Sequence, residues 1–160
     1  MVGLLRCLAL VFVVAVSGKG AVADPNEETL LTVTGVPQAV EYSLNDLMEL
    51  GQTRIRTTTI WTEGVQEFEG VPLIALLTDL GVTGGKLMTR AVNDYAVEVP
   101  VSDAVEGGPI IAFHRNGAPM TLREKGPLWL VYPYDSDPKY QTEVVYSRSI
   151  WQLDRIEVLP

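Results

Sequence analysis

The sequence predicts a single α+β domain. Short extended segments outnumber helical ones, and the helical segments are not spaced as the regular strand–helix–strand units of a doubly wound sheet. Apolar residues make up 47% of the 160 residues and charged residues 20%, a composition that is ordinary for globular proteins and argues against intrinsic disorder. The sequence contains no internal repeat and no linker rich in Ser, Gly or Pro, so we expect one domain built on one mixed sheet.

Residues 1–23 are predicted to be a secretory signal peptide. Arg6 supplies the positive charge, residues 7–16 form an uninterrupted apolar run, and the segment ends in Ala-Val-Ala, which is typical of a cleavage site. The alternative is an N-terminal membrane anchor, which needs about 20 apolar residues, but Lys19 ends this run too soon. We therefore expect an exported, periplasmic protein whose domain spans residues 24–160, with no stable membrane span after cleavage.

The predicted mature domain is acidic and has no cysteine. Loss of the signal peptide removes Arg6 and Lys19, which changes the formal charge from −8 to −10, and it removes Cys7, the only cysteine. A negative chain does not suit nucleic acid, because phosphate binding requires a basic surface. One His without a Cys also excludes the common structural zinc sites. The domain has no thiolate to serve as a nucleophile or metal ligand.

The first half of the domain begins with a strand and a short helix. Residues 30–35 alternate between apolar and polar side chains, as expected for a strand. Residues 43–50 are predicted to form a helix of about two turns that Ser43 caps and Gly51 ends. The Thr-rich residues 54–61 are predicted to be extended.

The strongest helix signal follows Pro72. Proline fits the first position of a helix, where its missing N–H leaves no hydrogen bond unmade. Gly81 is a stop signal for this helix. The apolar side chains recur at spacings of three and four and form one stripe, made by Leu73, Leu76, Leu77 and Leu80.

The middle of the domain is predicted to be mostly β structure. A turn at Gly84-Gly85 leads into the segment 86–92. Alternating valines predict a strand over 97–101, which Pro100 places near a strand end or a sheet edge. Residues 109–114 form a further extended run, and Asn116-Gly117 is a hairpin turn signal.

The last third is predicted to contain two strands and a loop. Residues 126–133 are continuously apolar in the middle, as expected for a strand buried on both faces. Residues 135–138 are a loop signal. Residues 148–159 are predicted to form the last strand, and their apolar pattern changes phase, which predicts a bulge or bend near Asp154.

The residues that carry chemistry are few, and we predict neither a catalytic group nor a metal site from them. The sequence has no Gly-x-Ser-x-Gly elbow, no Gly-x-Gly-x-x-Gly fingerprint and no Walker motif. Asp135 and Asp137 could bind calcium but lack the rest of an EF-hand loop. His114, the only imidazole, could act as a general base, although a lone His is more often structural.

The aromatic residues are the better candidates for a binding site. Trp and Tyr side chains can stack on a planar ligand or anchor a partner. Trp61, Tyr95 and Tyr134 each lie beside a predicted turn or loop, so we single them out as ligand-binding candidates. Trp129 and Trp151 lie in predicted strands and are expected in the core.

Several segments of this chain, taken in their order along the sequence, resemble the oxidoreductase molybdopterin-binding domain, the central domain of sulfite oxidases. The resemblance covers nearly all of residues 30–159, and it is to the small exported single-domain members and not to the large enzymes. It is carried by LTVTG, SLNDLMEL, FEGVPLIALLTDLGV, NDYAVEVP, IIAFHRNGAPM, GPLWLVYP and YSRSIWQLDRIEV.

The resemblance implies a fold more firmly than a reaction. In the enzymes of the family, a cysteine just after the strand that precedes the EGVPL-type helix binds molybdenum. This chain has Thr59-Ile60-Trp61-Thr62 in that neighbourhood. Since the mature domain offers no soft thiolate, the sequence disfavours molybdenum and leaves the cofactor unknown, with molybdopterin as the group that the resemblance implies.

The first functional hypothesis is a non-catalytic exported module that binds a small ligand or docks on a membrane sensor protein. The ligand or partner would bind at the cleft that holds the cofactor in the enzymes of the family. Aromatic side chains would stack on the ligand, and Arg148 would pair with an anionic group. The expected cleft residues are Trp61, Tyr95, His114, Tyr134 and Arg148.

The alternative is a molybdopterin-dependent oxidoreductase in which oxygen, nitrogen or water replaces the thiolate. Arg90, Arg115 and Arg148 would then neutralise the cofactor phosphate, and His114 would transfer protons. A third hypothesis is haem ligation by His114 with Met88 or Met120.

Overall fold

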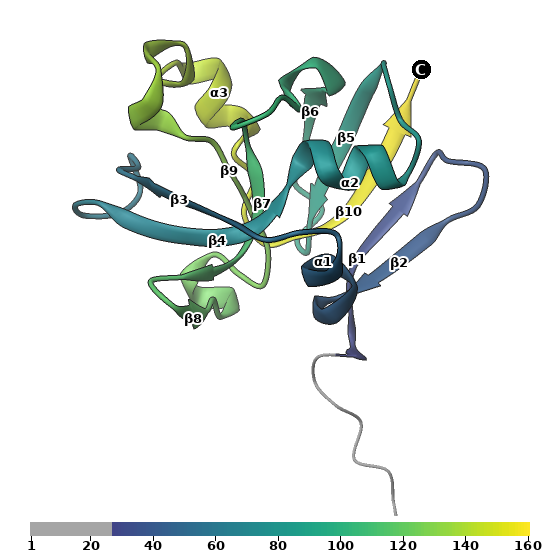
Figure 1. Ribbon diagram of the computed structural model, residues 1–160, viewed down its shortest axis with the longest axis horizontal. Helices are drawn as coiled ribbons and strands as arrows, with labels where there is room; N and C mark the ends of the chain where they lie inside the picture. The colour runs from purple at the N-terminus through teal and green to yellow at the C-terminus, as the bar shows by residue number, and fades with distance from the viewer. Residues whose placement is uncertain (1–26) are drawn as a thin grey trace, which may run out of the picture.

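The computed structural model describes residues 27–160 as two β-sheets and a few short helices (Figure 1). The first sheet has the order β2 (Val40–Ser43), β1 (Thr29–Thr34), β10 (Leu153–Leu159), β5 (Lys86–Ala91) and β6 (Ala96–Pro100). The second has the order β3 (Thr53–Thr57), β4 (Gln66–Pro72), β7 (Ile110–Arg115) and β8 (Ala118–Pro119), and β9 (Trp129–Val131) also pairs with β7. The predicted signal peptide lies outside the described residues.

The α+β class is confirmed, but the strands divide into two sheets where we expected one. Only β1 and β10 run parallel, and the other pairs of named strands are antiparallel. The α-helices of the described residues are short: α1 (Leu44–Glu49), α2 (Leu73–Asp79) and α3 (Glu143–Arg148). None of the helices within 27–160 has the length and apolar character needed to cross a bilayer.

The first two helices follow their sequence signals closely. The Ser43 hydroxyl accepts the Asp46 amide at 3.2 Å, and the Asp46 carboxylate accepts the Ser43 amide at 2.8 Å, so the predicted cap is a complete capping box. Pro72 is the residue before α2 and not its first helical residue, because it still pairs with Ile110 as the last residue of β4. The apolar stripe of α2 is buried at Leu73, Leu76 and Leu77.

The predicted strand over 148–159 is wrong in its first part. Residues 143–148 form α3, which Thr142 caps by accepting the Val145 amide at 3.3 Å, and the strand begins only at Leu153. The predicted bulge is confirmed, since the register of β10 against β5 shifts between Leu153 and Arg155. A helix this short gives too little periodicity to be recognised against the β-branched residues within it.

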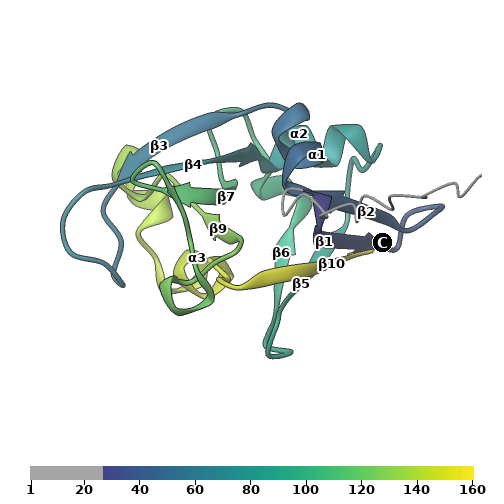
Figure 2. The ribbon, with the colours of Figure 1, turned by 90° about the horizontal axis from the view of Figure 1, so that it is seen from below.

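Backbone hydrogen bonds between the segments 125–130 and 149–153 join the two sheets. We call this contact the seam. The Leu130 amide donates to the Ile150 carbonyl at 2.9 Å, and the Leu153 amide donates to the Leu128 carbonyl at 3.0 Å. Trp129 and Trp151 form an isolated antiparallel bridge between these bonds. Figure 2 shows the result, with β10 running from the side of α3 into the first sheet beside β5.

The backbones of β4 and β7 approach closely at Gly70. The register of this strand pair shifts between Glu69 and Gly70. A Cβ atom on Gly70 would lie 2.6 Å from the Cα of Ala112, closer than two carbon atoms can approach without a shift of the backbone. Glycine is required here for close packing, and the second sheet depends on it.

We predict that Gly70→Ala lowers the free energy of unfolding by roughly 1–3 kcal/mol, the usual effect of overpacking. Gly84→Ala is the matched control, because a Cβ there would meet nothing within 4 Å. Urea unfolding followed by tryptophan fluorescence measures both variants. Equal midpoints for the two variants would show that β7 can move away from β4 freely.

Candidate functional site

A pocket of about 500 Å³ opens between three parts of the chain. These parts are the connection from β3 to β4, the turn from β5 to β6, and the segment from α3 to the start of β10. The volume falls in the range of small-molecule sites, roughly 300–1,000 Å³. We call it the aromatic pocket, and the wall residues that matter below are Trp61, Asn93, Tyr95, Tyr146, Ser149 and Trp151.

Trp61 is the central aromatic side chain of this pocket. Its ring centroid lies 5.5 Å from that of Trp151 and 5.8 Å from those of Tyr146 and Trp129, each in an edge-to-face arrangement. Such pairs are favourable beyond the area that they bury. The Thr59 hydroxyl accepts the Trp61 amide at 3.1 Å, a local turn that folds the loop back so that the indole reaches the pocket.

The seam places Trp151 opposite Trp61. Its neighbour Gln152 has a left-handed φ of 53°, donates its amide to the Lys125 carbonyl and accepts the Val92 amide, both at 2.9 Å. The ammonium of Lys125 lies 4.4 Å from the centroid of the Trp151 ring, a cation–π contact. The wall of the pocket that contains Trp151 is therefore held in place by main-chain hydrogen bonds.

The turn between β5 and β6 contributes Tyr95 and Asn93. The Asn93 side chain accepts the Tyr95 amide at 3.2 Å. Arg155 of β10 stabilises the turn, because it donates to the Asp94 carboxylate at 2.8 Å and to the Ala91 carbonyl at 3.1 Å. Tyr95 is 54% exposed, so it forms the open rim of the pocket.

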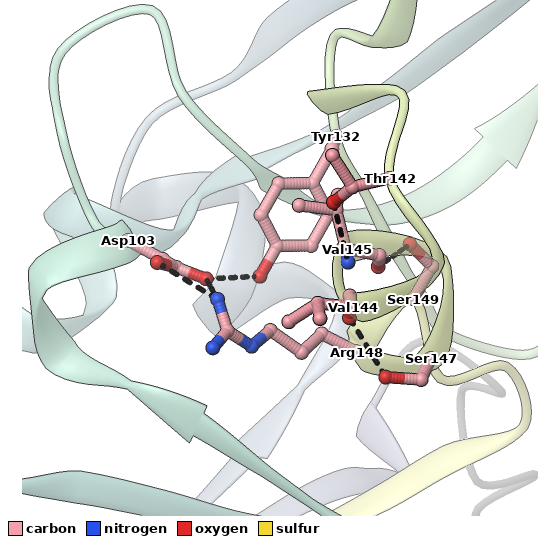
Figure 3. A network of polar contacts seen from close by, with 8 residues as sticks. All are labelled: Asp103, Tyr132, Thr142, Val144, Val145, Ser147, Arg148 and Ser149. Atoms are coloured by element: carbon pink, nitrogen blue, oxygen red, sulfur yellow. Dashed lines mark hydrogen bonds and ion pairs between the residues drawn. The ribbon is translucent and has the colours of Figure 1, made fainter. Parts of the chain in front are cut away.

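A partly buried polar network fixes α3 and the segment that leads to Ser149 (Figure 3). The same helix supplies Tyr146 to the pocket wall. Arg148 donates to Asp103 at 3.0 Å, and the Tyr132 hydroxyl donates to the same carboxylate at 2.7 Å. Burial, followed by the nearby Asp103 charge, raises the pKa of Tyr132 well above its usual value, so this phenol remains protonated. The network ties α3 to η2 (Val101–Asp103), the turn after β6.

Tyr134 lies behind the pocket and not on its rim. The side chain is 1% exposed, and its hydroxyl donates to Ser149 at 2.6 Å, which in turn donates to the Val145 carbonyl at 2.8 Å. Burial raises the pKa of Tyr134 to about 12. It therefore supports Ser149 from the core as a neutral hydrogen-bond donor.

The structure brings only Trp61 and Tyr95 of the five expected cleft residues into the pocket wall. Arg148 is engaged by Asp103. His114 lies on β7 with its Nδ1 atom 3.5 Å from the Glu69 carboxylate, so it belongs to the second sheet. These side chains contact partners that lie far from them in the sequence, and a local sequence pattern does not reveal such contacts.

The three arginines expected to hold a cofactor phosphate are dispersed in the structure. Arg90 lies on β5 opposite Arg155 of β10. Arg115 lies at the end of β7 with its guanidinium 3.9 Å from Glu124, and Arg148 is paired with Asp103. The lining of the aromatic pocket includes none of the three.

A carboxylate accepts hydrogen bonds from the residue that follows β3. Asp135 of η4 (Tyr134–Ser136) accepts the Thr58 amide at 2.6 Å and the Thr58 hydroxyl at 2.7 Å. The Asp135 amide donates to the Thr57 hydroxyl at 3.1 Å. The hydroxyl and amide of Thr58 hold the pKa of Asp135 below its usual value, so this group is an anion at neutral pH.

Sequence reasoning missed most of the pocket wall. Tyr146 lies on α3, a helix that the sequence does not predict, and Trp151, expected in the core, lies in the pocket wall. Asn93 and the serines of 147–149 carry no signal of their own, although Asn93 precedes a turn. No group of three His, Cys, Asp or Glu side chains within 27–160 is arranged to hold a metal ion.

Comparison with known proteins adds a family and a fold. Residues 19–136 match the sequence model of the family described as oxidoreductase molybdopterin binding domain. No curated protein is significantly similar to the chain. The crystal structure of the sulfane dehydrogenase SoxCD from Paracoccus pantotrophus matches with a TM-score of 0.63 at 19% identity, over 84% of this chain and 39% of that one. This likeness concerns the fold alone, and the present chain spans about two fifths of the chain that it matches.

We predict that Arg148→Ala lowers the free energy of unfolding by roughly 1–3 kcal/mol, because a hydrogen-bonded charge pair that is mostly buried loses one partner. Lys86→Ala is the control, since it removes an ion pair with Glu98 that is about half exposed and is expected to contribute under about 1 kcal/mol. Chemical denaturation of the two variants gives the comparison. A loss for Arg148→Ala no larger than that for Lys86→Ala would contradict a stabilising role for the network.

Proposed function

Because the chain belongs to the oxidoreductase molybdopterin binding domain family but its residues do not fit that cofactor, we propose that it is an exported, non-catalytic member that binds a small organic ligand in the aromatic pocket. The observation that carries the proposal is the pocket itself, enclosed by four aromatic side chains and free of ionised wall residues. Export to the periplasm rests on the sequence pattern of residues 1–23.

The donor set argues against a molybdenum centre. The thiolate that the family resemblance implies has no counterpart, since the only cysteine is Cys7 in the predicted signal peptide. The donors that this chain offers in place of that thiolate are the hydroxyl oxygens of the threonines at and just after the end of β3. A soft thiolate suits molybdenum better than a neutral hydroxyl does, because a hydroxyl oxygen is a hard and weak donor.

These threonine hydroxyls are also already engaged. The Thr57 hydroxyl donates to the Thr58 carbonyl at 3.2 Å, the Thr58 hydroxyl donates to Asp135, and those of Thr59 and Thr62 lie 2.8 Å apart. A metal ligand here would have to give up one of these bonds. The anionic Asp135 would in addition repel the charged phosphate and dithiolene of the cofactor.

The pocket wall does not suit an anion either. A phosphate group is held by arginine, lysine or a helix N-terminus, and the wall contains no basic side chain. Arg90, Arg115 and Arg148 lie apart, and two of them face carboxylates of their own. The residues present therefore do not form the phosphate site that the cofactor requires.

The features that remain favour a small organic ligand. Rigid aromatic rings provide contact area at a low entropic cost, and the ring contacts around Trp61 keep the pocket preformed. A membrane sensor protein is the other partner that the sequence leaves open. A concave pocket is better suited to a small molecule than to the flatter surface of a docking protein.

We expect ligand binding to depend on the aromatic rim. The exported protein is screened by thermal shift against panels of organic amines, amino acids, nucleobases and aromatic acids, and the compounds that raise Tm are titrated. Tyr95→Ala should weaken binding about 2- to 10-fold, which corresponds to one lost aromatic contact of roughly 0.5–1.5 kcal/mol. Leu122→Ala, at 53% exposure against 54% for Tyr95, is the matched control outside the pocket.

A second variant keeps this test independent of folding. Trp61→Leu retains an apolar side chain but removes the central ring, and it should weaken binding more than Tyr95→Ala does. Circular dichroism checks that both variants are folded. A compound that binds both variants as tightly as it binds the wild type would place its site elsewhere.

Family membership also favours the alternative of a molybdopterin-dependent oxidoreductase with a non-cysteine ligand, and metal analysis separates the two. We expect molybdenum well below one atom per chain, and no pterin fluorescence or Soret absorption, in protein exported to the periplasm of a host that makes the cofactor. Near-stoichiometric molybdenum or pterin would overturn the non-catalytic proposal. A Soret band would point to haem at His114.

A further inference from the structure

We infer that the ligand of the aromatic pocket is an organic cation with a quaternary ammonium group, an inference that rests on the proposed function and deepens it. The pocket combines three properties that suit such a group: aromatic walls of different orientation, no basic side chain, and an Asn93 oxygen and two serine hydroxyls that are already hydrogen-bonded within the protein. Each property favours a cation without N–H donors over another class of ligand.

The aromatic walls provide negative ring faces in several directions. The planes of Trp61 and Tyr146 are inclined by 87°, and those of Trp61 and Trp151 by 78°. Tyr95 adds a fourth ring at the rim. Rings that stand at such angles around one pocket can present their faces to a compact ligand from more than one side, and a cation within about 6 Å of a ring centroid is attracted by the ring quadrupole.

The charge of the surroundings favours a cation over an anion. The residues that line the pocket carry no formal charge, so an anionic ligand would be desolvated without a partner. The predicted exported domain has a formal charge of −10 against −8 for the full sequence, and a negative protein raises the local concentration of cations. The Trp151 ring already has one cation beside it, since Lys125 places its ammonium 4.4 Å from that ring and 5.7 Å from that of Trp129. We therefore expect Trp61, Tyr95 and Tyr146 to provide the main contacts with the ligand.

The polar wall atoms favour a quaternary ammonium over a primary one. The Asn93 side-chain oxygen accepts the Tyr95 amide at 3.2 Å, and the hydroxyls of Ser147 and Ser149 donate to main-chain carbonyls at 2.7 and 2.8 Å. A primary ammonium brings three N–H donors that need acceptors. A quaternary ammonium brings none, so it can leave water without an unmet hydrogen bond.

The test compares choline with 3,3-dimethylbutan-1-ol, which has the same shape but carbon in place of the charged nitrogen. The full chain is expressed, and the exported protein is titrated by isothermal calorimetry at one fixed ionic strength. We expect choline to bind at least about 5-fold more tightly than the neutral compound, within the range of a desolvated cation–π contact. Tyr95→Phe should retain choline binding, Tyr95→Ala should weaken it about 3- to 10-fold, and Leu122→Ala should leave it unchanged.

Two results would overturn this inference. If the neutral compound binds as tightly as choline and Tyr95→Ala weakens both, the pocket binds small molecules but does not select a cation, and the proposed function stands. If neither compound binds, the ligand is not of this class. The proposed function is then decided separately, by the compound panel with the Trp61→Leu and Tyr95→Ala variants.

Discussion

Main-chain hydrogen bonding between segments 125–130 and 149–153 is the constraint on which both the fold and the pocket depend. It joins the second sheet, through β9, to the start of β10 in the first sheet. Because backbone amides and carbonyls must be paired when they are buried, this contact fixes the side chains that it carries. It sets Trp129 in the core and presents Trp151 to Trp61, and the bond from Val92 to Gln152 brings the β5–β6 turn alongside.

The chain has the fold of its family, and the end of β3 is held by threonine hydroxyls and a carboxylate. Threonine hydroxyls and the carboxylate of Asp135 form a closed hydrogen-bonded group there. Such a group stabilises the β3–η4 contact but offers neither an open coordination position nor a soft donor. The shape of the domain depends on buried apolar contacts and strand pairing, which are independent of a metal ligand, so the fold by itself does not decide the chemistry.

The candidate site could be predicted only in part. The sequence predicts Trp61 and Tyr95 as site residues because they are large aromatic side chains beside turns or loops, and both lie in the pocket wall. The same argument failed to place Tyr134, because its hydroxyl finds a buried partner in Ser149. It also could not place Arg148, whose partner Asp103 is remote in sequence. An ionic group pairs with the nearest opposite charge in space, and a sequence does not report that distance.

The sequence by itself determined the features that depend on neighbours along the chain. These are the cap of α1 at Ser43, the buried stripe of α2, the hairpin turn at Asn116-Gly117, and the bulge near Asp154. The tertiary structure alone decided the division into two sheets, the pairing of Arg148 with Asp103, and the meeting of Trp61 with Tyr146 and Trp151. Local hydrogen bonds and backbone angles leave a pattern within a few residues, whereas contacts across the fold depend on how all the buried surfaces pack at once.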